Sequence, residues 1–338
     1  MEPSKLSSNQ RMNGGAGMPI NVKSCSKPSP SEDPIRFKNA PKSKNPSLTP
    51  KKSGQAKGLE RFVLINQASQ NNPIVPIMGI KNENGVVKYP LLLCSQEGTI
   101  MLALAAGVLL EICVDRSFRL VCNEDFMAYV NAGGGVSSIV HRFAKIVHSG
   151  EHVHCKFIAV NDRFAVLGAE GVLFSMQHLQ AAYLLNSGNE SRTRPSVVAI
   201  DKPEFPIKEI DYSLHQMYAV SQMGTEYISQ CNEIVQKAGY ERKRDGTLVI
   251  HINGIHIKSN ADTGEVSIQA KPIFMTMNSQ TNTVHLRSAF IDMAVQDRDK
   301  CYVKRADNRI HTSRSGMVVS DGTCNISIDQ HGEILSCS

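Results

Sequence analysis

Short hydrophobic or alternating runs follow one another from residue 59 to the end of the chain, separated by Gly, Asn and Asp. Their length and their β-branched residues predict strands rather than helices. Because the connections are short, we expect antiparallel hairpins and meanders. The strands predicted in the first half are Phe62–Ile65, Ile74–Ile80, Pro90–Cys94, Thr99–Leu104, Val108–Val114, Phe118–Cys122, Phe126–Val130, Ala144–His148, His152–Val160 and Phe164–Leu167.

Two stretches have helical spacing instead. Ser175 is a candidate N-cap for a short helix that carries Met176, Leu179, Ala182 and Tyr183 on one face. Between the two stretches, residues 187–207 have the polar, proline-containing composition of a linker. A longer apolar stripe predicts one long helix, which Gly224 weakens and Gly239 would cap. The stripe consists of Ile210, Leu214, Met217, Ile228, Cys231, Val235 and Ala238.

The sequence therefore predicts a mainly β protein with a few helices. Two antiparallel β-meander modules are joined by a linker and one long helix. Residues 1–58 are dense in Ser, Pro, Asn, Gly and Lys, cannot offset their ordering entropy by apolar burial, and are expected to be a disordered basic tail. The expected divisions after the tail are a β-meander domain with a closing helix at 59–186, the linker at 187–207, and a helix followed by a second β-meander domain at 208–338.

An acidic-Gly-Thr unit recurs in both halves of the body. Glu97-Gly98-Thr99, Asp245-Gly246-Thr247 and Asp321-Gly322-Thr323 each precede alternating residues and a second glycine, at Gly107, Gly254 or Gly332. An acidic residue and Gly permit the positive φ of a tight hairpin turn, and Thr starts the next strand well. The pattern indicates a repeated meander unit, although any antiparallel protein can reuse Asp-Gly turns.

These strand–turn–strand units resemble those of sperm-tail and ciliary central-apparatus proteins. Residues 97–185, with a strand meander and then a helix, are also similar to the polo-box-like modules of centriolar and mitotic proteins. The resemblance transfers no residue role. It implies protein–protein scaffolding, without chemistry.

The charge of the chain is segregated. The formal net charge is +6, but residues 1–58 hold eleven Lys/Arg and three Asp/Glu, so the tail carries +8 and the rest −2. A basic tail attracts polyanions such as nucleic acid, acidic tubulin tails or anionic lipid, or it only solubilises the chain. Thr49 with Pro50 fits a proline-directed phosphosite, and phosphate there would weaken polyanion binding. The candidate basic contact residues are Lys38, Lys42, Lys44, Lys51, Lys52 and Lys57.

The nine cysteines are irregularly spaced and form no Cys-x-x-Cys motif. The N-terminal residues lack an apolar signal region, and the longest apolar run, Ile100 to Cys113, is too short and polar to span a bilayer. We therefore expect reduced thiols, no membrane contact, and a cytoplasmic or cytoskeletal location, with the nucleus as an alternative.

Two segments carry candidate chemistry. On a strand, His152 and His154 would share one face, and His148 could join them across the turn at Ser149-Gly150 as a zinc ligand. Polar surface is the alternative, and we expect no metal or other cofactor. The glycines Gly133, Gly134 and Gly135 lack the Lys and helix of a phosphate loop. They are interpreted as a flexible hairpin loop, where Gly134→Val should cost much less than Gly246→Val.

The sequence contains no catalytic motif that we recognise, so no catalytic residue is predicted. The leading hypothesis is a non-enzymatic interaction or scaffold protein of a cytoskeletal, ciliary, sperm-tail or centriolar assembly. The alternative is a nuclear or germline chromatin-associated factor that contacts nucleic acid through residues 1–58. A cryptic enzyme is the third hypothesis.

Overall fold

The computed structural model describes residues 59–65, 76–82, 85–123, 125–158, 162–186, 196–296 and 299–337. Residues 56–338 form one compact unit. The predicted disordered tail, residues 1–58, lies outside the described residues.

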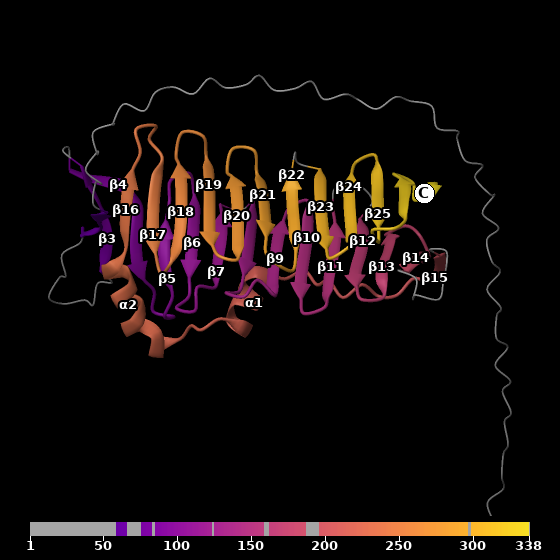
Figure 1. Cartoon of the computed structure of the whole chain (residues 1–338), viewed down its shortest axis with the longest axis horizontal. Coiled ribbons are helices and arrows are strands. Elements are labelled where there is room, and N and C mark those ends of the chain that lie inside the picture. The colour runs from indigo at the N-terminus through magenta and orange to yellow at the C-terminus, as the bar shows by residue number, and fades with distance from the viewer. Residues whose placement is uncertain are drawn as a thin grey trace, which may run out of the picture. The chain divides into compact units, whose positions relative to one another are not determined.

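Two large antiparallel sheets make up this unit (Figure 1). In the first sheet, 14 strands follow one another in sequence order. They are β2 (Val63–Leu64), β3 (Ile77–Asn82), β4 (Gly85–Cys94), β5 (Ile100–Ala103), β6 (Val108–Ile112), β7 (Phe118–Cys122), β8 (Phe126–Val130), β9 (Val136–His141), β10 (Ala144–Ser149), β11 (His152–Phe157), β12 (Arg163–Gly168), β13 (Gly171–Met176), β14 (Ala181–Asn186) and β15 (Ser196–Asp201).

The second sheet has 13 strands and begins with β1 (Glu60–Arg61), which pairs with β16. The other strands again follow sequence order. They are β16 (Gly239–Arg242), β17 (Leu248–Ile252), β18 (Ile255–Asn260), β19 (Glu265–Ala270), β20 (Ile273–Asn278), β21 (Thr283–Arg287), β22 (Asp292–Gln296), β23 (Lys300–Arg305), β24 (Asn308–Ser313), β25 (Gly316–Ser320), β26 (Asn325–Asp329) and β27 (Ile334–Cys337).

Alternation along each strand builds the core between the sheets. In β18, Ile255 and Ile257 are buried, whereas His256 and Lys258 are exposed. The inward-facing side chains of both sheets form one hydrophobic cluster. Each fully buried Ile, Leu or Phe there contributes about 1.5–3 kcal/mol. The predicted mainly β, antiparallel meander fold is thus confirmed, and its two meanders are layers around one core.

The two sheets advance in the same direction, which can be followed through hydrogen bonds between them. Near one end, Asn253 Nδ2 donates to Val114 O at 3.0 Å. Further along, His141 Nε2 donates to Asn282 O at 3.0 Å. Later still, Asn308 Nδ2 donates to Gly168 O at 3.0 Å. Each contact gives a buried or half-buried backbone carbonyl of one sheet a side-chain donor from the other sheet.

Residues 202–238, which we call the strap, connect the last strand of the first sheet to β16 at the far end of the second. They contain α1 (Tyr212–Val220), the 3₁₀ turn η1 (Thr225–Tyr227) and α2 (Ile228–Lys237). The single long helix predicted here is wrong. Gly224 has φ +139°, which breaks the helical path, and its N–H donates to Glu97 O at 2.8 Å. Gly239 begins β16, so the predicted C-cap is also wrong.

The predicted closing helix at Ser175–Tyr183 is wrong as well. Ser175 and Met176 end β13, and Tyr183 lies in β14, where it pairs with Phe174 and Ala199. Apolar residues at i, i+3 and i+7 fit a helix, but they also fit two strand ends separated by a turn. The strand partners of these residues decide between a helix and a hairpin. The polo-box-like order of strands and then a helix is therefore not present at 97–185. Residues 196–201, expected as linker, form β15.

The acidic-Gly-Thr units are hairpin turns as predicted. Gly98, Gly246 and Gly322 all have positive φ, and so do the second glycines of the three units. In the second and third units the aspartate fixes the turn: Asp245 Oδ1 accepts from Thr247 N at 3.0 Å, and Asp321 Oδ1 accepts from Thr323 N at 2.9 Å and from Cys324 N at 2.8 Å. Aspartate thus satisfies backbone donors that the turn leaves without strand partners.

Candidate functional site

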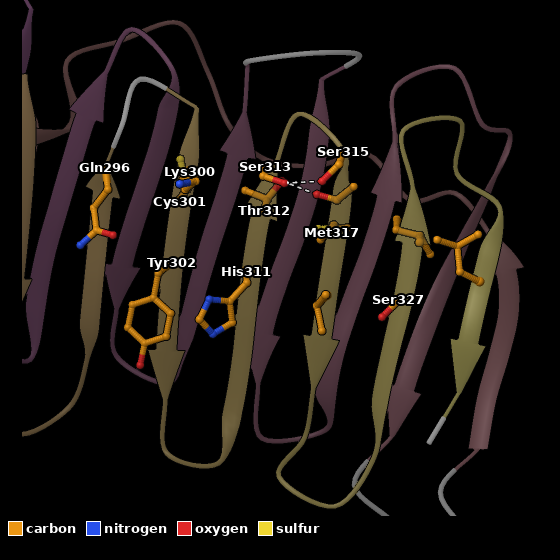
Figure 2. Close-up of a pocket in the computed structure, with 14 residues that line it drawn as sticks. Gln296, Lys300, Cys301, Tyr302, His311, Thr312, Ser313, Ser315, Met317 and Ser327 are labelled. Carbon is orange, nitrogen blue, oxygen red and sulfur yellow. Dashed lines mark hydrogen bonds between the residues drawn. The ribbon is translucent and has the colours of Figure 1, made fainter. Parts of the chain in front are cut away.

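A groove of about 500 Å³ lies on the second sheet, between strands β22 and β27 (Figure 2). Backbone pairing aligns its central side chains, because Tyr302 is opposite His311 and His311 is opposite Val318. The residues that line the groove are Gln296, Lys300, Cys301, Tyr302, His311, Thr312, Ser313, Ser315, Gly316, Met317, Val318, Ser327, Ile328 and Leu335.

Alternation turns Tyr302 and His311 outward. Their strand neighbours Cys301, Val303 and Ile310 are buried in the core, so the aromatic pair stands on the outer face. Their ring centroids are 4.7 Å apart, and Figure 2 shows the two rings side by side on adjacent strands. The pair gives the groove an aromatic wall, while Val318 and Leu335 supply exposed apolar surface.

The aromatic pair is uncharged at neutral pH. Burial, and then the charge of Arg309, lower the pKa of His311. Burial, and then Asp292, raise the pKa of Tyr302. Among the described residues that line the groove, none is Asp or Glu. The groove therefore offers apolar contact and hydrogen bonds from neutral groups, with Lys300 as the cation among its described lining residues.

Arg163 of the first sheet shapes one rim of the groove from the inside. It is buried on β12, and its guanidinium reaches across the core to the turn between β24 and β25. Its Nη1 donates to Thr312 Oγ1 and to Gly316 O, each at 2.7 Å, and also to Ser313 O. Burial lowers its pKa, which the charge of Asp329 partly offsets. The Arg163 guanidinium thus binds several polar atoms of the β24–β25 hairpin, which lines the groove.

The groove adjoins the edge of the second sheet. In the described part of the chain, β27 pairs on one side only, with β26. All four of its residues are exposed, and Leu335 is 67% exposed. The edge strand of the first sheet, β15, lies at the same end, since His178 Nε2 donates to His331 O at 2.8 Å between the turns before β14 and β27. Strand β15 exposes the side chains of Val198 and Ile200.

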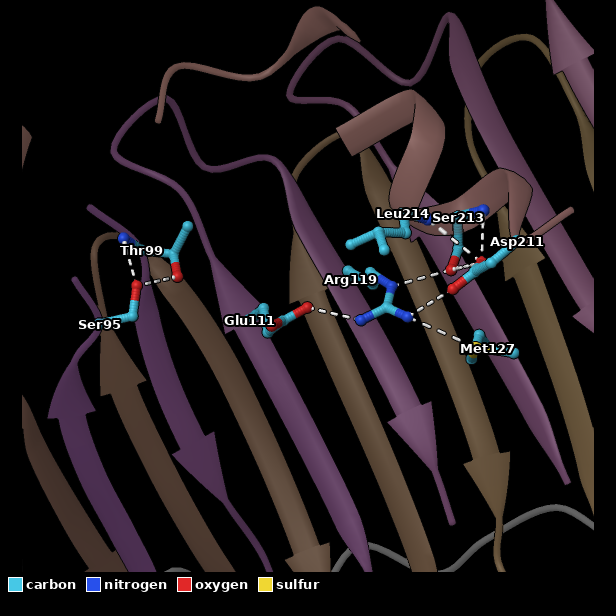
Figure 3. Close-up of polar contacts among 8 residues, drawn as sticks. All are labelled: Ser95, Thr99, Glu111, Arg119, Met127, Asp211, Ser213 and Leu214. Carbon is cyan, nitrogen blue, oxygen red and sulfur yellow. Dashed lines mark hydrogen bonds and ion pairs between the residues drawn. The ribbon is translucent and has the colours of Figure 1, made fainter. Parts of the chain in front are cut away.

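A second polar centre holds the strap against the first sheet (Figure 3). Arg119 Nη1 and Nη2 lie 2.7 Å from Glu111 Oε2 and Asp211 Oδ2, and Nε donates to Ser213 Oγ at 2.8 Å. Asp211 also caps α1 by accepting from the N–H groups of Ser213 and Leu214. Burial alone would raise the pKa of Asp211, but Ser213 and the charge of Arg119 outweigh it and hold that pKa low. These groups satisfy one another, so the centre is structural.

Two further hydroxyls drawn in Figure 3 stabilise the first acidic-Gly-Thr turn. Ser95 Oγ and Thr99 Oγ1 are 2.8 Å apart, and Thr99 N donates to Ser95 Oγ at 3.1 Å. Both side chains are buried. Each hydroxyl is used locally, so the pair has the same structural role as the aspartates in the other two turns.

The structure does not bring the three candidate zinc ligands together. His148 pairs with Val153 and is fully buried on the inner face, whereas His152 and His154 lie on the outer face of β11. Their rings stack with centroids 6.2 Å apart. Among the described residues, no group of three or more His, Cys, Asp or Glu side chains is placed to hold a metal. The prediction that His148 could join His152 and His154 across the turn as a zinc ligand is therefore wrong.

The three-glycine loop is a hairpin turn between β8 and β9, as predicted, but it is not tolerant at its centre. Gly134 has φ +75°, and a Cβ there would lie 2.6 Å from Ser288 Cβ. A Cβ on Gly246, by contrast, would meet only Asp262 Oδ2 at 3.8 Å. The structure therefore contradicts the expectation that a side chain at Gly134 costs much less than one at Gly246.

The candidate contact residues of the tail lie outside the described residues and stay predictions. These are Thr49 and Lys38, Lys42, Lys44, Lys51, Lys52 and Lys57. Within the described part, no helix is long and apolar enough to cross a membrane. The groove residues and Arg163 were missed by sequence reasoning. The only signal for them is an alternating strand pattern, which any exposed sheet face shares.

Comparison with known proteins gives one family and one solved structure. A family model described as "Domain of unknown function (DUF8796)" matches residues 90–338. The chain is also similar to the TCP10 domain of Danio rerio CPAP, solved in complex with a peptide of Danio rerio STIL. The identity is 10%, the match covers 78% of this chain and 98% of that chain, and the TM-score is 0.18, too low to carry an argument. No curated protein matches the chain.

Proposed function

We propose that this chain, which belongs to the DUF8796 family, is a non-enzymatic scaffold that binds an extended segment of another protein. The segment adds to the free edge of β27 and places side chains in the adjacent groove. The observation that carries the proposal is an edge strand with four exposed residues beside an apolar groove with an aromatic wall.

The edge supplies the affinity for a backbone. An unpaired strand presents a row of N–H and C=O groups that an incoming strand can satisfy. Here β27 offers such a row in the described part of the chain. The exposed side chains of Ile334 and Leu335 add apolar surface, and its removal from water on binding is favourable. An extended protein segment fits this edge better than a helix, because only a strand continues the ladder.

The groove supplies the selectivity for side chains. Tyr302 and His311 are neutral and adjacent, and Val318 lies on the next strand. Apolar or aromatic side chains of the partner would pack on this surface. Since side chains of a strand alternate, every second residue of the segment would face the groove. A segment with alternating apolar residues is therefore the expected ligand.

A non-enzymatic role is supported by what surrounds His311. Acid–base or nucleophilic catalysis needs a base that a second group orients toward a nucleophile. The described residues that line the groove include no carboxylate that could orient His311. The hydroxyls of Ser313 and Ser315 lie 2.9 Å apart and bond each other. These contacts suit binding.

The assembly in which the scaffold works is a further part of the proposal. A cytoskeletal, ciliary, sperm-tail or centriolar assembly is suggested by the resemblance of the acidic-Gly-Thr units. The alternative, a nuclear or germline chromatin-associated role, rests on the +8 charge of residues 1–58. Localisation of the tagged full-length chain to a microtubule structure or to chromatin separates the two.

The binding proposal is tested with surface variants of the full chain. Leu335→Lys and Val318→Lys change the edge and the groove, and Tyr218→Lys changes an exposed residue of α1 as a matched control. Quantitative affinity capture should find a partner that both site variants lose and the control keeps. Peptides tiled across that partner should contain one extended segment whose Kd rises about tenfold or more with each site variant. Equal binding by all four proteins would contradict the proposal.

A further inference from the structure

We propose that Cys324 and Cys337 form a reversible disulfide that ties the terminal strand β27 to the turn before β26. The two Sγ atoms lie 3.6 Å apart in the structure. The inference rests on the positions of these two thiols, so it stands or fails independently of the proposed binding function.

Strand pairing brings the two cysteines together. Cys324 comes directly before β26, and β27 runs antiparallel to β26, so the end of β27 returns to the same place. Cys337 lies opposite Ile326, two residues from Cys324. The two residues are therefore diagonal across the strand pair, and their side chains turn toward each other so that the Sγ atoms are 3.6 Å apart.

The backbone around Cys324 is held in position. Asp321 Oδ1 accepts from Cys324 N at 2.8 Å and from Thr323 N at 2.9 Å, and Cys324 itself is buried. Cys337 is exposed and is the last residue of the edge strand β27. Bond formation therefore requires the exposed Sγ of Cys337 to move from 3.6 Å to bonding distance of a thiol whose backbone is held in place.

Cys337 is the thiol that an oxidant can reach. It is exposed, whereas the other seven described cysteines are buried. Burial, and then the neighbouring Cys337, raise the pKa of Cys324 to about 12. Since thiolates are the reactive form, the first step occurs at Cys337 and Cys324 resolves it.

A peroxide is the oxidant class that this arrangement suits. The Cys337 thiolate attacks one peroxide oxygen, the O–O bond breaks, and the departing oxygen leaves as water after taking a proton. Cys337 is then a sulfenic acid. The sulfur of Cys324 loses its proton and attacks the sulfur of Cys337, the S–O bond breaks, and a second water leaves. Two thiols are oxidised, one peroxide is reduced, and a dithiol reverses the bond.

The consequence is a clip on the exposed edge. The bond would close a loop that contains β26, the turn and β27, and the terminal strand could no longer separate from the sheet. A closed loop of this size removes conformational freedom from the detached state of the strand. Oxidation would thus hold the edge strand in place, and reduction would leave it free to fray.

Peptide mapping of the full-length protein tests the bond directly. Residues 315–338 contain no internal Lys or Arg, so trypsin releases both cysteines in one peptide, and cleavage after Glu333 separates them. After hydrogen peroxide treatment, we expect the segments 315–333 and 334–338 to stay linked until a dithiol is added. In the untreated protein, N-ethylmaleimide should label Cys337 first among the described cysteines.

Matched variants separate the clip from unspecific oxidation. Cys324→Ser and Cys337→Ser should each abolish the linked peptides, and Cys25→Ser should leave them unchanged. The buried neighbours Cys94 and Cys231 serve as an internal control that should stay reduced. The proposal is overturned if Cys337 links to Cys25 or to a second molecule, if Cys94 and Cys231 link first, or if Cys337 proceeds to sulfinic acid in the wild-type protein.

Discussion

Ser288 Oγ donates a hydrogen bond to the carbonyl oxygen of Gly134 at 3.0 Å, and this contact joins a loop of the first sheet to a loop of the second. The same hydroxyl accepts from Phe290 N at 3.1 Å, so it also orders its own turn. Gly134 can approach Ser288 this closely because it has no Cβ. The three-glycine loop is therefore part of the interface between the sheets.

We predict that Gly134→Val lowers the free energy of unfolding more than Gly246→Val does. Both positions have positive φ, which alone costs about 1–3 kcal/mol for a β-branched residue. At Gly134 a steric conflict with Ser288 adds to this cost, whereas Gly246 faces nearly open space. Urea denaturation curves of the two variants make the comparison.

Gly133 provides the control for that comparison. A Cβ there meets nothing within 4 Å, so Gly133→Val should be nearly neutral. If Gly134→Val were as mild as Gly133→Val, the contact with Ser288 would have no part in joining the sheets.

Replacement of Arg163 by Met should destabilise the protein by about 2–4 kcal/mol, because buried carbonyls would lose a charged donor. Arg163 bonds Thr312, Ser313 and Gly316 from the opposite sheet. Thermal melts at fixed pH measure the loss. Since these acceptors line the groove, the Kd for a groove ligand should rise as well.

Arg314→Met is the control for Arg163. Its guanidinium is exposed and lies 3.3 Å from Asp299, the geometry of a surface ion pair worth less than about 1 kcal/mol. Similar losses in the two variants would mean that the location of Arg163 between the sheets is unimportant.

We predict that His148 makes the protein less stable as the pH falls from 6.5 toward 4. Burial, and then the charge of Arg305, lower the pKa of His148 to about 4, while the unfolded value is 6.5. Between these values the unfolded chain binds a proton that the folded chain does not, so acid favours unfolding. The difference in melting temperature between wild type and His148→Gln should shrink or reverse across this window. A difference independent of pH would contradict the prediction.

The basic tail should give the chain a salt-dependent affinity for polyanions. Changing the six candidate contact lysines of the tail (Lys38, Lys42, Lys44, Lys51, Lys52 and Lys57) to Gln should weaken binding to duplex DNA. It should also flatten the slope of log Kd against log salt by about 0.9 for each phosphate that the tail no longer neutralises. Fluorescence anisotropy of the full chain measures both effects. Gln at the exposed body residues Lys243, Lys258 and Lys271 is the matched control and should leave the slope unchanged.

Strand positions could be predicted from sequence wherever alternation was strong. The run Phe118–Cys122 is a strand with the predicted bounds, because an apolar inner face and a turn on each side define it. Strand β9 was missed because Ser137 and Ser138 look like loop residues, although both are buried. The helix expected at Ser175–Tyr183 failed because local spacing cannot reveal that Tyr183 has strand partners on both sides.

The groove could not be predicted from sequence, because its lining residues meet only through pairing across the six strands β22 to β27. Tyr302, His311 and Val318 are aligned by register, and register is set by the hairpins between them. Arg163 lies 149 residues before its acceptor Thr312 in the sequence. No local pattern connects such residues, whereas the acidic-Gly-Thr turns are local and were predictable.

In both sheets, strands that are neighbours in sequence are also neighbours in space, apart from β1 beside β16. The body therefore behaves as a linear array in which each hairpin contacts the hairpins before and after it and those facing it. A perturbation at one hairpin is felt mainly by these neighbours, so the two ends can fray independently of the middle. Lengthening such a protein requires one new hairpin in each sheet at the same level, so that neither inner face loses its cover.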